Sequence, residues 1–347
     1  MATSYIEAIP TAPRLLLEAT LVPIAGSRFQ PTGFPNLGAA EYVTWDGVEH
    51  ILVESAQSIA NRLEMMAWDD ARGDLVSTLH GIPYVSTIVE GVPTDSIREA
   101  HRLNSPYLEG IYEPLRARAE IKGTKKANKA KKVDAAAKPD DGDAAAVVED
   151  STSVDIRKLA AAVFAYDPNS VLHGIFLTKI VGLARLTRLL SGFIEAHDVR
   201  IVASGGVKND RIDPSGKRHK TSDGKGGAEA GFGNVPFARS EYTAKTILAS
   251  FSMDVALLRS YGLPEPAQRL LVELALWKIQ RFLDSGLRLR TACDLEMTEN
   301  GLRVRRPNDM LIPSLAELDD RLPRTIRECA DAGLFVEGVI TKVPYGT

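Results

Sequence analysis

The residues of this chain most able to do chemistry form a basic stretch, GGVKNDRIDPSGKRHKTSDGKGG, at residues 205–227. Its lysines and arginines outnumber its acidic residues, which include Asp210 and Asp213. Side chains of this kind attract nucleic-acid phosphates, and glycines let the backbone approach them closely. A loop longer than about 15 residues is usually either functional or disordered. The stretch therefore predicts a phosphate-binding loop, with a disordered insertion as the alternative.

Sequence motifs for common catalytic and metal chemistry are missing. The six histidines do not show HxxxH or HExxH spacing, which argues against a zinc site of those types. There is no GxSxG elbow and no GxxxxGK[ST] loop. The glycine-rich GKGGAEAGFG is not followed by a helical pattern, so its glycines indicate a flexible loop. We therefore expect no metal, no cofactor and no enzymatic activity.

Apolar spacing predicts the elements that carry the basic stretch. Alternation predicts a half-buried strand at 13–25, with Leu15, Leu17, Ala19 and Leu21 on one face. Asp46-Gly47 predicts a hairpin turn. A helix is expected at 54–70, with Ser55 as its N-cap. The basic stretch lies between expected strands at 198–205 and 247–255.

The remaining elements favour an α+β fold with a mostly antiparallel sheet. Helices are expected at 154–166, 179–198, 265–286 (ended by Gly286) and 313–334 (broken near Pro323), an extended segment at 170–177, and a hairpin around Asn300-Gly301. This order lacks the regular strand–helix–strand rhythm of a doubly wound sheet.

A low-complexity segment, residues 122–150, interrupts this pattern. Its first half is rich in lysine, its second half is rich in acids, and it has no aromatic residue. Such a segment cannot bury enough apolar surface to compensate for its loss of entropy on ordering. We expect a flexible surface insertion; the alternative is that its lysines contact nucleic acid.

The composition is that of an ordinary globular protein, with 44% hydrophobic residues and a net charge of −3. No apolar run of about 18 residues is present, and the N-terminus does not resemble a signal peptide. We therefore expect a cytoplasmic protein without membrane contact. Cys293 and Cys329 are expected to be free structural thiols.

Four segments carry a resemblance to a known family. They are LLLEATLVPIAGSRFQPTGFPNLG (15–38), ESAQSIANRLE (54–64), ARLTRLLSGFIEAHDVRIVASGGVKNDRI (184–212) and GFGNVPFARSEYTAKTILASFSMD (231–254). Together they resemble the backbone subunit of type I-U (also called I-G) CRISPR surveillance complexes, a member of the RAMP superfamily. The resemblance covers nearly the whole chain except 122–150.

The resemblance implies a single RAMP-type domain over 1–347. Its RRM-like (ferredoxin-like) palm would carry helical and loop fingers, and 205–233 would form a β-hairpin thumb. Several copies would stack along one CRISPR RNA and present the guide for pairing with target DNA in antiviral defence. Other Cascade subunits (guide-processing or capping and large subunits) and a recruited helicase–nuclease would be partners.

The resemblance also implies where RNA would bind. The expected RNA-binding residues are Arg28, Gln30 and Arg239 in the palm, Ser55, Gln57, Asn61 and Arg62 on the first helix, Lys179, Arg185 and Arg188 on the helix expected at 179–198, and Lys208, Arg211, Lys217, Arg218 and Lys220 in the thumb. The alternative for both helices is a solvated polar face. The usual aromatic pattern of an RRM sheet is missing, which favours groove and thumb contacts.

Two enzymatic alternatives remain open from the sequence. Some RAMP backbone subunits cut target RNA with a loop aspartate, and Asp210 or Asp213 would be the candidate here. Alternatively, 205–233 would be the mobile lid of a small-molecule enzyme. A well-formed apolar pocket would favour the lid, and an open basic groove would count against it.

Overall fold

The computed structural model describes residues 12–34, 38–121, 154–180, 184–208, 235–308 and 310–346. The chain divides into a first unit (Met1–Met66, Leu190–Asp254, Ala275–Leu318) and a second unit (Ala67–Leu189, Val255–Leu274, Asp319–Thr347). The expected insertion at 122–150 and residues 209–233 of the expected thumb lie outside the described residues. The assignment of 1–347 to one RAMP-type domain stays a prediction.

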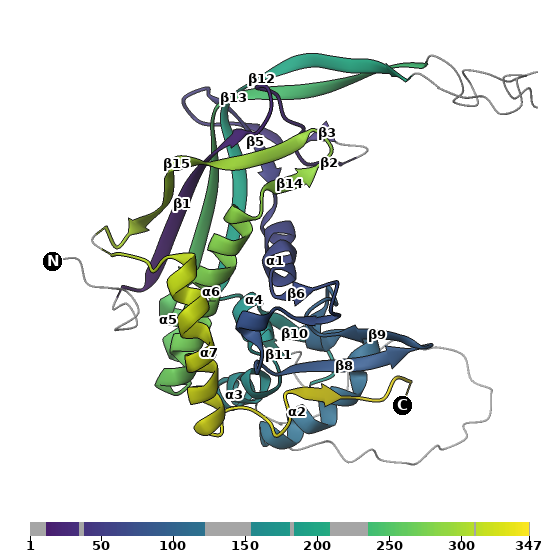
Figure 1. The fold of residues 1–347 in the computed structure, drawn as a ribbon, viewed down its shortest axis with the longest axis vertical. Coiled ribbons are helices and arrows are strands. Elements are labelled where there is room, and N and C mark those ends of the chain that lie inside the picture. Colours follow the sequence, from purple (N-terminus) through teal and green to yellow (C-terminus); the bar gives the residue numbers. More distant parts are fainter. Residues whose placement is uncertain are drawn as a thin grey trace, which may run out of the picture. The chain divides into compact units, whose positions relative to one another are not determined.

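A seven-stranded sheet forms the centre of the first unit (Figure 1). Its order is β14 (Leu287–Arg290), β15 (Cys293–Arg306), β1 (Arg14–Pro23), β13 (Val235–Asp254), β12 (Leu190–Lys208), β5 (Glu49–Glu54) and β4 (Glu41–Val43). Every neighbouring pair in it is antiparallel. The expected α+β class with a mostly antiparallel sheet is confirmed, and the RRM-like arrangement of palm, fingers and thumb stays a prediction.

Strand β1 fits its predicted alternation. Leu15, Leu17, Ala19 and Leu21 are all buried. On the neighbouring strand β13, Phe251 lies opposite Leu17 and Ala249 lies opposite Ala19, so the apolar side chains of both strands share one face. Ile51 and Val53 of β5 are also fully buried.

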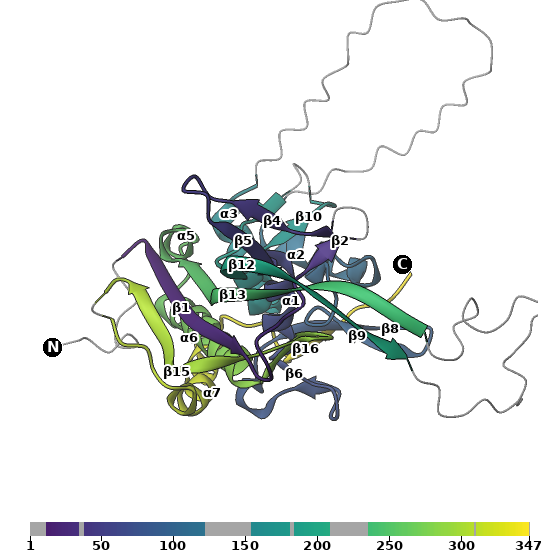
Figure 2. The same cartoon turned by 90° about the horizontal axis from the view of Figure 1, so that it is seen from above.

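Strands β12 and β13 continue past the rest of the sheet as a two-stranded ribbon. They pair along their whole length, from Leu190↔Met253 to Lys208↔Val235. Strand β5 pairs with β12 only between residues 194 and 197, and β1 pairs with β13 only between residues 247 and 254. Figures 1 and 2 show the ribbon projecting beyond the ends of the other strands. The basic stretch therefore begins at the far end of a long hairpin.

The predicted hairpin and first helix of this unit are confirmed. Gly47 has a φ of 83° in the turn between β4 and β5. Helix α1 (Ala56–Met65) begins after Ser55, whose hydroxyl accepts a hydrogen bond from the Ser58 amide. The helix ends earlier than predicted, and the short strand β6 (Trp68–Asp69) follows. Helix α1 packs against β12.

The described part of the second unit contains three small sheets and several helices. Its elements are β6, β7 (Asp74–Leu75), β8 (Tyr84–Val89), β9 (Val92–Asp95), α2 (Tyr112–Arg118), α3 (Ile156–Tyr166), α4 (Pro168–His173), β10 (Ile175–Leu177), β11 (Ala184–Leu186), α5 (Val255–Ser260) and β16 (Ile340–Lys342), with short 3-10 helices at Ser77–Leu79, Arg102–Asn104 and Pro106–Ile111. Strands β16 and β8 pair in parallel. Helices α6 (Glu265–Asp284) and α7 (Leu315–Asp331) have residues in both units. Among the described residues, no helix combines the length and apolar character needed to cross a membrane.

The helix predicted at 179–198 is wrong. Residues 184–186 form β11, and β12 begins at Leu190. Ile194 and Ala196 are buried, whereas Phe193 is 39% exposed, which is the two-residue period of a strand. Pairing with β13 and β5 on both sides outweighs the helical spacing of the leucines.

Three further expectations need correction. The segment expected to be extended at 170–177 is helical in its first part, where Asp167 caps α4. Asn300-Gly301 is not a hairpin turn, because β15 runs through it. Gly301, with a φ of 65°, lies in the irregular part of β15 where the register against β1 shifts, between Leu302 and Met297. Helix α7 continues through Pro323 without a break. The predicted end of α6 near Gly286 is confirmed, and Gly286 has a φ of 67°.

Both cysteines are free and buried, as expected. Burial raises the pKa of the Cys293 thiol to about 11, and it raises the pKa of the Cys329 thiol to about 12. Neither thiol is therefore ionised near neutral pH, and both act as apolar packing groups.

The close approach of Gly192 to β13 gives a test of the sheet. A Cβ at this position would lie 2.5 Å from Cδ1 of the buried Phe251 ring. We expect Gly192→Ala to lower the free energy of unfolding by about 1–3 kcal/mol, because the ring must shift within a packed core. Chemical denaturation measures the change. Ile201→Ala, on the exposed part of the ribbon, is the control and should change it by less than about 0.5 kcal/mol; equal stabilities of the two variants would contradict this packing.

Candidate nucleic-acid interface

A buried glutamate holds two arginines at the base of the β12–β13 ribbon. Glu241 of β13 is only 3% exposed. Its carboxylate pairs with Arg239 of the same strand and with Nη1 of Arg28, at 3.4 Å. The same Arg28 nitrogen donates a hydrogen bond to Ser204 Oγ on β12, at 3.2 Å. These contacts bring together three segments that lie far apart in the sequence.

The electrostatics of Glu241 favour its charged form. Burial alone would raise the pKa of this carboxyl. Hydrogen bonds from Ser204 and Arg239, together with the charges of Arg239 and Arg28, outweigh burial and lower the pKa. The side chains of Arg28 and Arg239 are still 54% and 37% exposed. Both guanidinium groups are thus fixed in position and accessible to an anion.

An open groove of about 730 Å³ lies beside Arg239. It is lined by Gln30, Pro31, Thr32, Gly33, Gly38, Ala39, Glu41, Arg239, Ser240, Tyr242 and Arg290. The Gln30 side-chain oxygen is buried and has no hydrogen-bond partner among the described residues. Burial and a hydrogen bond to Glu41 raise the pKa of Tyr242 to about 12. The groove therefore offers both basic and neutral hydrogen-bonding groups, with one acid beside them.

A second buried glutamate connects this groove to helix α1. Glu54, at the end of β5, is 2% exposed. It accepts hydrogen bonds from Ser58, from Arg290 and from Nε of Arg62, the last at 3.2 Å. Arg290 also donates to the Gln30 carbonyl, at 3.1 Å. Glu54 and Arg290 thus fix the position of α1 relative to the groove.

The residues expected to bind RNA from α1 have different local roles. Ser55 caps the helix, and Gln57 donates to Asn61 at 3.1 Å. Arg62 is held by Glu54 and by the Leu289 carbonyl, to which it donates at 2.6 Å. Asn61 and Arg62 line a pocket of about 450 Å³ together with residues 285–289. RNA contact by these four residues stays a prediction.

The three basic residues expected on the 179–198 helix belong to the second unit and do not share a helix face. Lys179 forms an ion pair with Glu109. The Arg185 guanidinium lies 4.7 Å from the centre of the Phe176 ring, and Arg188 donates to the His173 carbonyl at 3.2 Å. Arg28, Gln30 and Arg239 belong to the first unit, and RNA contact by Lys179, Arg185 and Arg188 stays a prediction.

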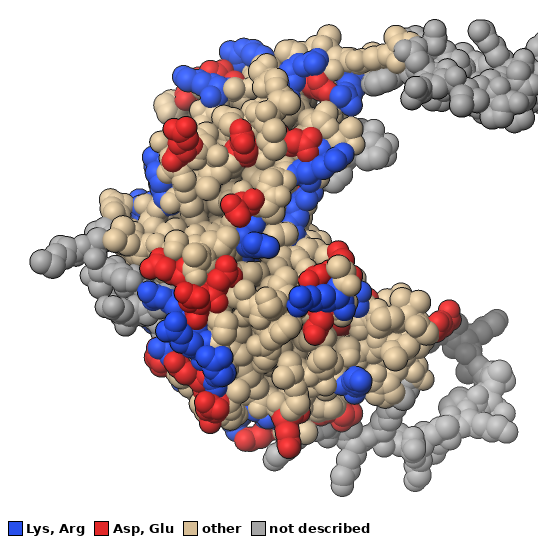
Figure 3. All heavy atoms as spheres, viewed as in Figure 1, with Lys and Arg blue, Asp and Glu red and all other residues tan. Residues whose placement is uncertain are grey.

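The RNA-binding residues expected in the thumb lie largely outside the described residues. Lys208 ends β12, but its side chain is outside the described residues, as are Arg211, Lys217, Arg218 and Lys220. Asp210 and Asp213 lie there too. On the face shown in Figure 3, basic and acidic side chains are interspersed within each unit and do not form one basic stripe.

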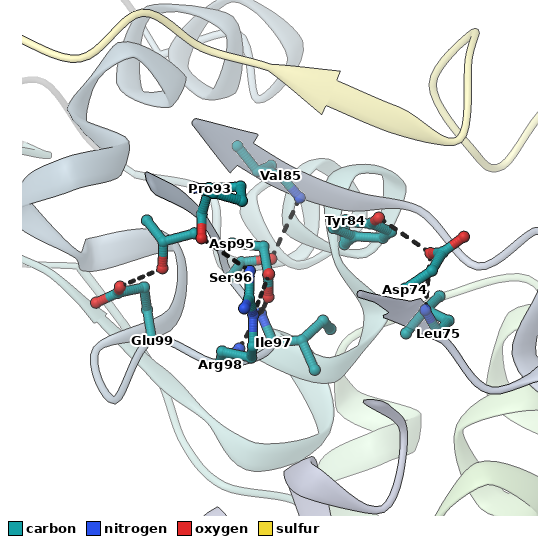
Figure 4. Close-up of polar contacts among 11 residues, drawn as sticks. Asp74, Leu75, Tyr84, Val85, Pro93, Asp95, Ser96, Ile97, Arg98 and Glu99 are labelled. Atoms are coloured by element: carbon teal, nitrogen blue, oxygen red, sulfur yellow. Dashed lines mark hydrogen bonds and ion pairs between the residues drawn. The ribbon is translucent and has the colours of Figure 1, made fainter. Parts of the chain in front are cut away.

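The polar side chains of a cluster around Asp95 in the second unit form hydrogen bonds and ion pairs with neighbouring residues (Figure 4). Asp95 is 1% exposed and accepts hydrogen bonds from the backbone amides of Ile97 and Arg98. The Arg98 side chain pairs with the same carboxylate at 2.6 Å and lies over the Trp68 ring. Nearby, Tyr84 donates to Asp74, and burial raises the pKa of Tyr84. With its carboxylate paired and bonded in this way, Asp95 stabilises the turn that follows β9.

Sequence reasoning missed the residues that hold the interface together. Glu54, Glu241 and Arg290 were not among the candidates. A buried acid gives no local signal that distinguishes it from a surface acid. The only available signal was alternation, which places Glu241 on the same face of its strand as Arg239.

The Glu54 cluster gives a stability test. We expect Glu54→Gln to lower the free energy of unfolding by about 2 kcal/mol, because two arginines lose a buried counter-charge. The effect is smaller than for fully buried pairs, since Arg62 and Arg290 are 30% and 24% exposed. Chemical denaturation measures it. Glu49→Gln, which removes an exposed partner of Arg200, is the control and should change stability by less than about 1 kcal/mol. If both variants cost equally little, Glu54 does not organise the cluster.

Comparisons with known proteins bear on this interface. The model of the family described as CRISPR-associated protein GSU0053 matches residues 15–201. Among solved structures, a chain of "CRISPR RNA-guided surveillance complex, pre-nicking" is 12% identical, with 92% of this chain and 86% of that chain covered and a TM-score of 0.41. Csc2 of Thermofilum pendens is 10% identical, with 93% and 78% covered and a TM-score of 0.30. At these TM-scores, neither structure contributes to the assignment.

No curated protein matches the chain. The family match begins in β1, includes α1 and the second unit's helices α2 to α4, and ends within β12. It covers more than half of the 347 residues. The expected resemblance to a CRISPR-associated family is confirmed: the chain belongs to the CRISPR-associated GSU0053 family.

Proposed function

We propose that this protein is a CRISPR RNA-binding backbone subunit of a type I-G Cascade complex. The observation that carries the proposal is the family match over residues 15–201. The match contains Arg28, which together with Arg239 forms the arginine cluster held by Glu241. Arg28 and Arg239 are partly exposed, and Arg239 lines the open groove. Such arginines suit phosphate binding, since a guanidinium presents several donors in a fixed geometry.

The proposed mode of binding is contact with the RNA backbone. A guide-holding protein must accept RNA of any sequence, and phosphate contacts fix position without reading bases. Arg28, Gln30 and Arg239 would line the path of the RNA, and the ribbon would extend the loop with Lys217 and Lys220 over it as the thumb. The support is the ribbon itself, whose paired strands end at Lys208 and Val235, the residues that flank this loop in the sequence.

The proposed assembly is a filament. Copies of the chain would stack along one CRISPR RNA and present it for pairing with target DNA in antiviral defence. Guide-processing or capping subunits, a large subunit and a recruited helicase–nuclease would complete the system. In this role the chain is a cytoplasmic scaffold and needs neither a cofactor nor catalysis.

The first experiment is to identify what the protein carries. We expect protein purified after co-expression with a CRISPR array to show a raised ratio of absorbance at 260 nm to 280 nm. Extraction should give RNA of uniform length. Co-expression with an array of scrambled repeats is the control. A clean protein spectrum, with no gel shift on added RNA at low salt, would refute the proposal and favour a small-molecule enzyme with a lid. RNA cleavage that Asp210→Ala abolishes would favour the endonuclease.

The second experiment tests the arginine cluster directly. We expect Arg28→Ala with Arg239→Ala to weaken RNA binding about tenfold, whatever the RNA sequence, because two phosphate contacts are lost. The slope of log affinity against log salt should decrease by about 0.7 for each contact. Fluorescence anisotropy over a salt series measures both quantities.

The matched control for this variant is Arg14→Ala with Arg72→Ala. These arginines are also exposed and also paired with a carboxylate, on Asp254 and Asp69. The control changes the net charge equally and should leave the salt slope unchanged. An unchanged slope in the Arg28 and Arg239 variant would show that the cluster does not touch phosphate.

A further inference from the structure

Two histidines and a glutamate meet on one face of the first unit's sheet. His50 of β5 and His197 of β12 are direct cross-strand partners, and their ring centres lie 4.5 Å apart. Glu195 precedes His197 by two residues, so both side chains lie on the same face of β12. One possible ligand atom from each residue lies within 4.8 Å of the other two. This face is opposite the core, because Ile51 and Ala196 alternate with these residues and are buried.

The distances suit a small divalent metal ion. His197 Nε2 and Glu195 Oε2 are 3.1 Å apart. Nitrogen and oxygen ligands about 2.0–2.2 Å from a tetrahedral zinc ion lie about 3.3–3.6 Å from each other. These two atoms are therefore near the separation that zinc requires, without any movement of the backbone. The His50 ring completes the triangle from the neighbouring strand.

The polar contacts around the cluster leave His50 incompletely satisfied. Its Nδ1 atom is buried and has no hydrogen-bond partner among the described residues. A buried polar atom without a partner is unfavourable by about 1–3 kcal/mol in general, so it calls for an explanation. A metal ion would supply this explanation. Its coordination by the imidazole would either occupy Nδ1 directly or fix the orientation of the ring that carries it.

Tyr42 of the edge strand β4 supports the arrangement. It is the cross-strand partner of His50 on the other side of β5, and its ring stacks on the imidazole at 5.2 Å. Its hydroxyl donates to Glu195 Oε1 at 2.5 Å. One carboxylate oxygen is thus held by Tyr42, while the other faces His197. A hydrogen-bonded ligand carboxylate of this kind is typical of metal sites.

We propose that His50, Glu195 and His197 bind one Zn²⁺ ion, with water as the fourth ligand. Two imidazoles and a carboxylate favour zinc over Mg²⁺ and Ca²⁺, which prefer oxygen ligands only. The ion would join β5 to β12 near the edge of the sheet, beside the start of the ribbon. This site is separate from the arginine cluster and does not depend on RNA binding.

The test is a zinc titration of tag-free, chelator-stripped protein in competition with a chromophoric chelator. We expect the wild-type protein to bind one equivalent of Zn²⁺ in this site. His50→Ala and His197→Ala should each weaken binding at least tenfold. His101→Ala is the matched control: it removes one exposed imidazole from the second unit and should bind zinc as the wild type does.

Two results would overturn the proposal. One is an absence of saturable zinc binding to the wild-type protein, and the other is equal affinity of the wild type and the two histidine variants. Circular dichroism verifies that the variants fold. If they do not fold, Co²⁺ titration of the wild-type protein decides: intense visible absorption of a four-coordinate ion supports the site, and the weak absorption of a six-coordinate ion overturns it.

Discussion

The antiparallel pairing of β12 with β13 is the constraint on which the rest of the first unit depends. One register runs from Leu190↔Met253 to Lys208↔Val235. Within the sheet it buries alternate residues of both strands. Beyond the sheet it carries the chain outwards as a ribbon. Because side chains alternate with a period of two, a slip by one residue would move every side chain of one strand to the other face. Such a slip of β12 would expose Ile194 and Ala196 and would turn Ser204 away from Arg28. Burial of the core therefore also sets the position of the arginine cluster.

Two buried carboxylates fix the positions of four arginine side chains on the first unit. Glu241 holds Arg28 and Arg239, and Glu54 holds Arg62 and Arg290. An isolated buried carboxylate would be strongly unfavourable, but each of these has two cationic partners. The guanidinium groups lose much of their rotational freedom in the folded protein. An anion that binds them then meets a smaller entropy cost, which is the general advantage of preorganisation.

Several local signals in the sequence predict structural features that are confirmed. The alternation in β1, the Ser55 cap of α1 and the end of α6 at Gly286 all depend on residues within one element. The helix predicted at 179–198 is wrong because its leucines and arginines fit a helical period. The strand that forms there instead pairs with β13 and β5, which lie far away in the sequence. Glu54 and Arg290 are separated by more than two hundred residues, so no spacing could connect them. The histidines show the same limit: HxxxH and HExxH spacings identify zinc ligands within one helix, whereas His50 and His197 meet across two strands.

The mixture of charges at the interface has a consequence for the proposed filament. Arg28 and Arg239 share their charge with Glu241, so they attract phosphate less strongly than free cations would. They still keep unused donors, because a guanidinium carries five N–H groups and a carboxylate occupies only some of them. A lysine in the same ion pair would have fewer donors, and they would lie in a less defined plane. Each copy would therefore bind a short RNA weakly but in a defined geometry. In the proposed filament, stacking of copies along one guide would multiply such contacts through effective concentration. A long guide would then be held firmly by many copies, while a stray short RNA, bound by one copy, would dissociate.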